Sequence, residues 1–418
     1  MRLLYVCNDF GIKPDGVKGA SVHLRAITGA LSRAGHELML LSPQPGPGPS
    51  HPVQPLVLGD CPAITKAVRP FRRWAESQGV DPALARDLRP LFYNTWAPEK
   101  VRKILQSNPP DAIIERLSLF SCMGMELADS FQVPLLVEVN AILTREASQH
   151  RTLYLRSLAE EIETRTLRRA DALLAVSGQL ASALAGHRAA TRRIHHIPNG
   201  VDLDIIDRGP DRSDTRRLLG FGPDDLVIGF VGSLKPWHGV ELLLETFGRF
   251  RATDTRVRLL IVGSGPGEEE LRCQATALGI CESTVFTGAV PHEQVPALLR
   301  TMDIATAPYP PSGDFYFSPL KLFEYMAAGL CCVVPRLGQI GELIDHGENG
   351  LLYDPSPPDG LITALNDARC PSRRQALGRA ARATIESRYC WDHTANRITE
   401  VLEAILPLPR SLDAIATT

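Results

Sequence analysis

The chain has 418 residues, of which 44% are hydrophobic and 22% charged, and its formal net charge is −2 at pH 7. This length exceeds what one ordinary core requires and predicts two soluble domains of about 200 residues each. A charge so close to zero excludes a chain whose whole surface is built to bind nucleic acid. No apolar run approaches the roughly 18 residues of a membrane span.

The nine cysteines are spread thinly and form no CxxC pair, which disfavours a zinc or redox function. The N-terminal segment MRLLYVCNDF goes directly into a strand pattern, without the long apolar stretch and cleavage site of a signal peptide. We therefore expect a cytoplasmic protein.

The chain begins with a β-α-β pattern. Residues 2–7 are predicted to form a strand, about 21–34 a helix and 36–41 a second strand. The loop before the helix, which contains Gly19, lies at the carboxyl end of a strand, where open α/β sheets bind ligands. Its glycines are too widely spaced for the GxGxxG dinucleotide fingerprint, and loops of this kind are usually plain connections.

A proline- and glycine-rich surface loop (43–55) is followed by a helical region (62–106) that we expect to be broken by its prolines. Its segment KAVRPFRRWAES is basic and carries Phe71 and Trp74. This segment either rests on an anionic membrane surface or is a solvated helix with its aromatic rings turned inward.

Two buried strands are predicted at 111–115 and 134–139, and a charge-rich helix at about 144–168. Four polar residues stand at the carboxyl ends of these two strands: Glu115, Arg116, Glu138 and Asn140. These residues could simply cap the strand ends, but their shared position favours a role in binding a substrate or in catalysis.

The second half repeats the alternation of strand and helix. Strands are predicted at 227–231 and 304–307, within the segment RVRLLIV that precedes Gly263, and in the pattern at 284–288, with glycine loops and helices between them. This order predicts a second doubly wound domain. Its loops place Gly232, Gly263, Gly288 and the 314–321 segment on one edge of the sheet. An arginine-rich helix and a last helix, from about Trp391, end the pattern.

The segment 309–335 predicts a loop, a helix and a buried strand. Ser318 is the expected N-cap, Pro319 the first helical residue and Gly329 the left-handed C-cap. The strand follows directly as an apolar run, which is typical of a strand that is buried on both faces.

Lys321 is an unusual residue for this position, because a cation in the first turn faces the positive end of the helix dipole. Free N–H groups, dipole and ammonium together make a phosphate site, and Glu324, one turn further on, could accept hydrogen bonds from sugar hydroxyls. The alternative is an exposed Lys321–Glu324 ion pair, and the residues alone leave both interpretations open.

The motif SPLKLFEYMAAG, which contains both residues, resembles the donor-site signature of the family 4 retaining glycosyltransferases. The resemblance covers nearly the full chain and is strongest at 227–334. It implies the α/β GT-B fold, with two doubly wound Rossmann-like domains facing across a cleft and a C-terminal helix that crosses back to the first domain. The expected boundaries are 1–203 for an acceptor-side domain, 204–386 for the donor domain and 387–418 for the returning helix.

The resemblance also implies a set of functional residues. Those expected to contact the nucleotide sugar are Gly19, Gly232, Ser233, Lys235, His238, Gly263, Gly265, Val290, Tyr316, Ser318, Pro319, Leu320, Lys321 and Glu324. Those expected to act in catalysis are Glu138, Asn140, Asp314 and Lys321. Catalysis would consist mainly of positioning and leaving-group stabilisation, because no nucleophile–base pair emerges from the sequence.

The chain departs from the family pattern at four places. Ser233 and His238 stand where arginine and lysine are common, Tyr316 replaces a glutamate that contacts the donor sugar, and Asn140 replaces a histidine. The positive charge that stabilises the diphosphate group of the nucleotide sugar would then come from Lys321, Lys235 or both.

The expected reaction is sugar transfer from a nucleoside-diphosphate sugar to a hydroxyl acceptor, with retention. The acceptor would be a saccharide, a lipid-linked molecule or a small molecule, and peripheral contact with the inner membrane face is an expectation. We expect no cofactor, no metal and no nucleic-acid partner.

Three other functions stay open. Glu115 and Glu138 are compatible with a nucleotide-sugar epimerase or hydrolase, and Ser233, Tyr316 and Asn140 with a catalytically silent sugar-nucleotide-binding protein. An NAD-dependent oxidoreductase is the third.

Overall fold

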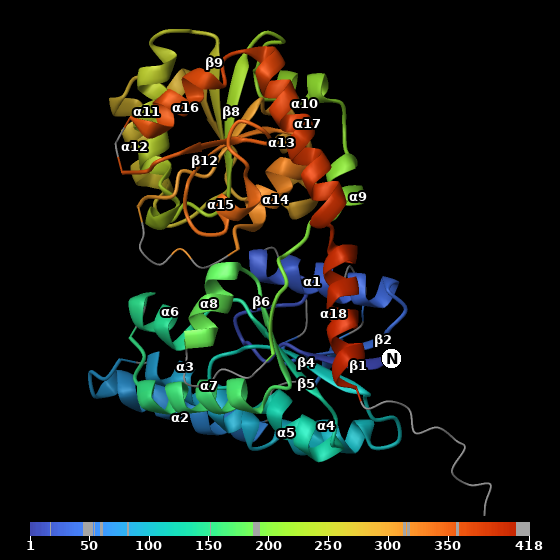
Figure 1. Cartoon of the computed structure of the whole chain (residues 1–418). Helices are drawn as coiled ribbons and strands as arrows, with labels where there is room; N and C mark the ends of the chain where they lie inside the picture. The colour runs from blue at the N-terminus through green and yellow to red at the C-terminus, as the bar shows by residue number, and fades with distance from the viewer. Residues whose placement is uncertain are drawn as a thin grey trace, which may run out of the picture. The chain divides into compact units, whose positions relative to one another are not determined.

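The computed structural model describes residues 1–16, 18–44, 53, 55–58, 62–81, 83–150, 152–186, 193–311, 315, 318–356 and 359–406. The chain forms two compact units (Figure 1): Met1–Ile197 together with the segment that begins at Thr394, and Pro198–His393. Each unit contains one parallel β-sheet.

The sheet of the first unit has, within the described residues, the strand order β3-β2-β1-β4-β5-β6-β7. The strands are β1 (Arg2–Val6), β2 (Glu37–Ser42), β3 (Pro55–Val57), β4 (Ala112–Arg116), β5 (Leu135–Val139), β6 (Ala172–Ala175) and β7 (Ile194–His196). The helices are α1 (Gly19–Arg33), α2 (Pro62–Ser77), α3 (Ala83–Asn94), α4 (Ala97–Leu105), α5 (Met123–Phe131), α6 (Leu143–His150), α7 (Arg156–Arg169) and α8 (Gly178–Gly186). Every residue of β4, β5 and β6 is buried, as expected for central strands covered on both faces.

Several predictions for this unit are wrong in detail. The predicted helix at 144–168 is two helices, α6 and α7. The helical region is broken as expected, but not at Pro70 or Pro90, which lie inside α2 and α3. The chain turns at Gly79, where φ is +68°, and Pro98 stands in the first turn of α4. The three-residue edge strands β3 and β7 were not predicted, since all of their residues are only half-buried, β3 is a short run directly after a proline- and glycine-rich loop, and β7 contains two histidines.

The sheet of the second unit has, within the described residues, the order β10-β9-β8-β11-β12-β13. The strands are β8 (Leu226–Val231), β9 (Val257–Val262), β10 (Thr284–Phe286), β11 (Ile304–Thr306), β12 (Cys331–Pro335) and β13 (Leu351–Tyr353). The helices are α9 (Leu203–Asp207), α10 (Arg212–Leu218), α11 (Val240–Arg251), α12 (Glu268–Ala277), α13 (Val295–Thr301), α14 (Leu320–Ala327), α15 (Ile340–Leu343), α16 (Gly360–Asp367) and α17 (Pro371–Arg388), with short 3₁₀ turns η1 (Pro236–His238), η2 (Cys281–Ser283) and η3 (His292–Gln294). Alternate residues of β8 enter two separate cores, so helices cover both faces of this sheet.

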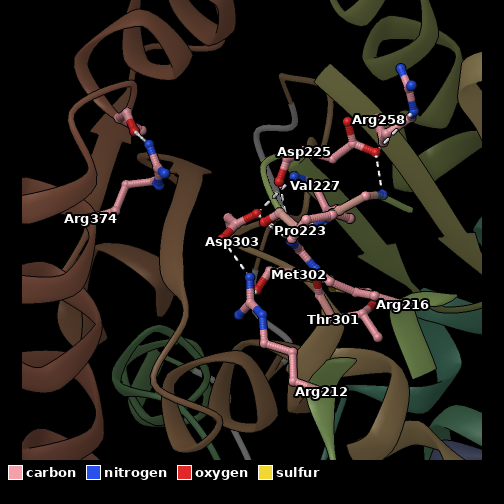
Figure 2. Close-up of polar contacts among 12 residues, drawn as sticks. Arg212, Arg216, Pro223, Asp225, Val227, Arg258, Thr301, Met302, Asp303 and Arg374 are labelled. Carbon is pink, nitrogen blue, oxygen red and sulfur yellow. Dashed lines mark hydrogen bonds and ion pairs between the residues drawn. The ribbon is translucent and has the colours of Figure 1, made fainter. Parts of the chain in front are cut away.

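An arginine network holds the amino-terminal edge of the second sheet (Figure 2). Arg216 donates to the carboxylate of Asp303 at 2.7 Å and to four backbone carbonyls, those of Gly222, Pro223, Asp225 and Thr301. Asp303 also accepts from the N–H of Val227, the second residue of β8. These contacts pair a buried guanidinium with enough acceptors to offset its desolvation. They stabilise the amino-terminal edge of the sheet, which lies opposite the glycine loops that follow β8 and β9.

The last helix, α18 (Trp391–Ile405), starts in the second unit and joins the first unit from Thr394 onward. His36 Nε2 lies 2.8 Å from Thr399 Oγ1, and Arg397 donates to the carbonyl of His196 at 2.6 Å. The prediction that the final helix returns to the first domain is therefore confirmed. Within the described part of the chain, no helix is long and apolar enough to cross a membrane.

Candidate functional site

The carboxyl edge of the second sheet contains a topological switch point. β8 lies between β9 and β11, so the connections that leave β8 and β11 run to opposite sides of the sheet. Ligands of open α/β sheets bind in the crevice at such a point. The loop after β8 and the chain leading from β11 into α14 meet here, as predicted from the order of the glycine loops.

Two loops at this edge are packed backbone against backbone. A Cβ on Gly263, whose φ is +127°, would lie 2.0 Å from the carbonyl oxygen of Gly232, and a Cβ on Gly265 would lie 2.5 Å from that of Leu234. The N–H of Leu234 also donates to the carbonyl of Ser264 at 3.0 Å. Only glycine permits this approach. The closely packed peptide groups of the two loops, at Gly232, Gly263 and Gly265, form a rigid surface, the glycine floor.

Lys321, in the first turn of α14, lies over this floor. Its Nζ is 4.3 Å from the ring centre of Phe230 and 5.3 Å from that of Tyr309, and a Cβ on Gly232 would lie 2.6 Å from it. Among the described residues, nothing accepts a hydrogen bond from this buried nitrogen. Burial lowers its pKa to about 7, although Glu324 acts in the opposite direction. The group is therefore prepared to take up a proton and an anion together.

His238, in η1, faces the same place as a neutral ring. Burial, aided by the positive charges of Lys321 and Lys235, lowers its pKa to about 4. Its Nδ1 lies within hydrogen-bond distance of the carbonyl oxygen of Ser233 and, because a carbonyl only accepts, must carry the proton. Nε2 is then an acceptor that a hydroxyl group can use.

Lys235 points to a different partner. Its Nζ lies 4.6 Å from the ring centre of Trp237, whose side chain is exposed. Of the two lysines proposed to face the diphosphate, Lys321 is the one whose nitrogen is buried at the switch point.

The start of α14 differs from the prediction. The helix begins at Leu320, and the cap position is held by Pro319, whose ψ of 88° keeps it outside the helix. Ser318 is therefore not the N-cap. Its Oγ is buried and, among the described residues, makes no hydrogen bond, so it stays available to a ligand. Gly329, with φ of +68°, ends the helix as predicted.

Glu324 lies in the second turn of α14, one turn beyond Lys321. Its Oε1 is 3.0 Å from Nε2 of His292, a residue that the sequence analysis did not single out. Val290, half-buried, is two residues before that histidine. Gly19 is the exposed first residue of α1, in the first unit. Asp314 and Tyr316 lie outside the described residues.

A second polar cluster surrounds Glu138 in the first unit. Tyr5 donates to its Oε2 at 2.7 Å and Arg116 to its Oε1 at 2.8 Å, while Asn140 also donates to Oε1 and His23 Nε2 lies 3.5 Å away from that oxygen. Burial raises its pKa, but His23 and Arg116 outweigh burial, and the pKa lies below its usual value. A carboxylate engaged so fully orients its neighbours and is a poor proton acceptor.

Glu115 lies on the other face of the same sheet, because neighbouring residues of a strand point to opposite sides. It is buried against Gly124 and accepts from Ser121 at 2.8 Å, and burial raises its pKa to about 7. The four predicted strand-end residues therefore form two separate sites: Arg116, Glu138 and Asn140 meet, and Glu115 does not join them.

Groups of three or more His, Cys, Asp or Glu side chains able to hold a metal are absent from the described residues. The site residues that sequence analysis missed are His292, His23 and the rings of Phe230 and Tyr309. A histidine shortly after a predicted strand was the only available signal for His292, and the rings were indistinguishable from core residues.

The chain matches two family models, each over one of its halves. Residues 17–205 match Glycosyltransferase Family 4, and residues 225–368 match Glycosyl transferases group 1. The chain therefore belongs to the family 4, group 1 glycosyltransferases.

Two curated relatives are informative. A GDP-mannose-dependent alpha-(1-6)-phosphatidylinositol monomannoside mannosyltransferase of Mycolicibacterium smegmatis is 30% identical over 238 residues, which are 56% of this chain and 62% of that protein. The glycogen synthase of Mycobacterium tuberculosis is 28% identical over 414 residues, which are 96% of this chain and 94% of that one. The match to the mannosyltransferase thus spans about three-fifths of its length.

Solved structures agree on the fold. HepE of Anabaena in complex with UDP-glucose has a TM-score of 0.71 at 20% identity, covering 97% of this chain and 100% of that one. The sucrose-phosphate synthase of Thermosynechococcus elongatus has a TM-score of 0.70 at 18% identity, covering 97% and 99%. The two Rossmann-like units are those of the GT-B fold.

Proposed function

We propose that this chain transfers a sugar from a nucleoside-diphosphate sugar to a hydroxyl acceptor, with retention of the anomeric configuration. The nucleotide sugar would bind at the carboxyl edge of the second sheet. Lys321, the glycine floor and the first turn of α14 would face the diphosphate, and Glu324 the ribose. His238 and Ser318 would supply hydrogen bonds.

The observation that carries this proposal is the buried nitrogen of Lys321. Within the described chain this nitrogen has no hydrogen-bond acceptor. Its burial over two aromatic rings and a glycine backbone therefore carries a desolvation cost that no hydrogen bond offsets. A diphosphate would provide the missing charge. The same positive group would stabilise the negative charge that the diphosphate gains as it leaves the sugar.

The experiment is a thermal-shift panel on the purified full chain with UDP, GDP, ADP, CMP, NAD and NADP. A ligand at 100 times its dissociation constant adds about 2.7 kcal/mol of stability, which is easily detected. A shift with one nucleoside diphosphate supports the proposal and identifies the base. A shift with NAD or NADP alone would overturn it in favour of an oxidoreductase, and no shift at all would overturn the proposed donor site.

Turnover of the nucleotide sugar distinguishes sugar transfer from hydrolysis and epimerisation. UDP-glucose and GDP-mannose are the first donors to test, since these nucleotides occur in the names of the relatives. Release of nucleoside diphosphate only when a saccharide or inositol phosphate is added indicates a transferase, whereas release without acceptor indicates a hydrolase or epimerase. Retention is tested by the anomeric proton coupling of the product, and an inverted product would refute it.

Contact with a membrane surface is a separate part of the proposal, and α2 supports it. Trp74 is 55% exposed and lies 5.7 Å from the ring of Phe71, on a helix with basic residues at Lys66, Arg69 and Arg72. Such a helix binds anionic bilayers. Co-sedimentation with vesicles containing phosphatidylglycerol should fall several-fold for Trp74→Ala. Equal binding to purely zwitterionic vesicles, or none to either kind, would contradict this contact.

A further inference from the structure

His292 connects two segments of the proposed nucleotide site. It opens the 3₁₀ turn η3, which follows β10, and its Nε2 lies 3.0 Å from Oε1 of Glu324 in α14. The two side chains are 22% and 17% exposed, so both are largely withdrawn from solvent while a small molecule can still reach them. The contact therefore spans the gap between the loop after β10 and the second turn of α14.

The chemistry of this contact assigns each atom a role. An ionised carboxylate has only acceptors, so Nε2 of His292 must donate the hydrogen bond. This bond occupies Oε1 and fixes the plane of the carboxylate. Among the described residues, Oε2 of Glu324 makes no hydrogen bond, so one oxygen is held and the other is free.

We propose that His292 is a positioning residue, which holds Glu324 so that its free oxygen accepts hydrogen bonds from the ribose hydroxyls of the nucleotide. This inference rests on the proposed function, in which Glu324 faces the ribose. What it adds is His292 as the residue on which discrimination between ribonucleotides and deoxyribonucleotides depends. The alternative is a plain ion pair between two helical segments, which would affect stability but not the choice of sugar.

A preorganised carboxylate explains why the histidine would matter to binding. A free glutamate must be ordered when the ligand arrives, and the entropy lost in ordering such a side chain weakens affinity about 2- to 10-fold. A carboxylate already held by His292 avoids this loss. The gain is realised only if the ligand offers a hydroxyl, because a deoxyribose leaves the same oxygen without a partner.

The test is isothermal titration calorimetry on the full chain, with UDP, GDP or ADP, whichever binds, and with its 2′-deoxy and 3′-deoxy forms. We expect the native chain to prefer the ribonucleotide by about tenfold, as for a hydrogen bond to a charged group. Glu324→Gln should remove most of this preference. His292→Ala should weaken the ribonucleotide about fivefold and leave at least one deoxynucleotide nearly unchanged, and the double variant should resemble Glu324→Gln because the residues act as a unit.

Two further variants test whether the effect depends on the hydrogen bond that His292 donates. His292→Gln places an amide N–H where Nε2 donates and should restore part of the preference. Glu293→Gln removes an exposed neighbouring charge, so it should bind like the native chain.

The inference is overturned if His292→Ala weakens ribo- and deoxyribonucleotides equally, or if its effect simply adds to that of Glu324→Gln. It is also overturned if the native chain does not discriminate between them. In each of these cases nucleotide binding remains, and the proposed function stands. Absence of binding by every nucleotide would overturn both.

Discussion

Raising the pH from 6 to 8.5 should weaken donor binding, and Lys321 should be the cause. Its nitrogen is buried and, among the described residues, has no acceptor, so its pKa in the free protein is about 7. A lysine with a lowered pKa is protonated below that value and neutral above it. Because the diphosphate needs the ammonium form, binding takes up a proton wherever the free lysine is neutral.

The size of the effect follows from the protonated fraction. With a pKa of about 7, roughly 90% of Lys321 is charged at pH 6 and roughly 3% at pH 8.5, and apparent affinity scales with the competent fraction. Donor affinity should therefore fall about 30-fold over this range. The neighbouring ring of His238 does not reverse this, because with a pKa of about 4 it stays neutral throughout.

Calorimetry at several pH values is the assay, with UDP-glucose or GDP-mannose as ligand, because a sugar-blocked diphosphate has no proton to lose in this range. Two buffers of different ionisation enthalpy count the protons taken up, which should approach one per ligand at pH 8.5. Lys321→Met should bind weakly and without this pH dependence. Affinity in the native chain that stays within twofold from pH 6 to 8.5 would refute the reasoning.

Three further predictions concern stability. Lys321→Met should raise the free energy of unfolding of the ligand-free chain at pH 6 by about 1–3 kcal/mol, and its melting temperature with it, because it removes a buried polar group without an acceptor among the described residues; an unchanged or lower melting temperature would contradict this. Arg216→Ala should cost about 3–5 kcal/mol in urea unfolding, since Asp303 then loses a buried partner, whereas the exposed control Arg217→Ala should cost under about 0.5 kcal/mol. Gly263→Ala should unfold the loop edge and abolish nucleotide binding, because its Cβ would lie 2.0 Å from a carbonyl oxygen, while Gly279→Ala, with open space around it, should cost only about 1 kcal/mol.

The architecture could be predicted because it depends on patterns that are local in sequence. Buried parallel strands appear as apolar runs, and the strands β1, β4, β5 and β8 were all predicted within one residue or two, while β9 lies in the segment that was expected to contain a strand. The edge strands β3 and β7 were missed, since a three-residue strand buries too little to leave a pattern.

The candidate site was only partly predictable. Lys321 stood out because a cation at a helix start contradicts the helix dipole, and Glu324 followed from its spacing. Their surroundings could not be deduced: the ring of Phe230 is 91 residues away from Lys321 in the chain, and His292 is 32 residues away from Glu324. Such contacts are set by how strands order in the sheet, which no local pattern encodes.

The sequence by itself determined that this protein has two doubly wound units. It also predicted that ligands bind at the carboxyl edges of their sheets, and that Lys321 and Glu324 form either a phosphate site or an exposed ion pair. Tertiary structure argues against the exposed ion pair, because it buries Lys321 over an aromatic ring without an acceptor in the described chain and places Glu324 against His292. The ligand site stays a prediction. It also separated Glu115 from Glu138 onto opposite faces of one sheet. The physical reason is that burial and hydrogen-bond partners, which set charge and reactivity, arise only when distant segments pack together.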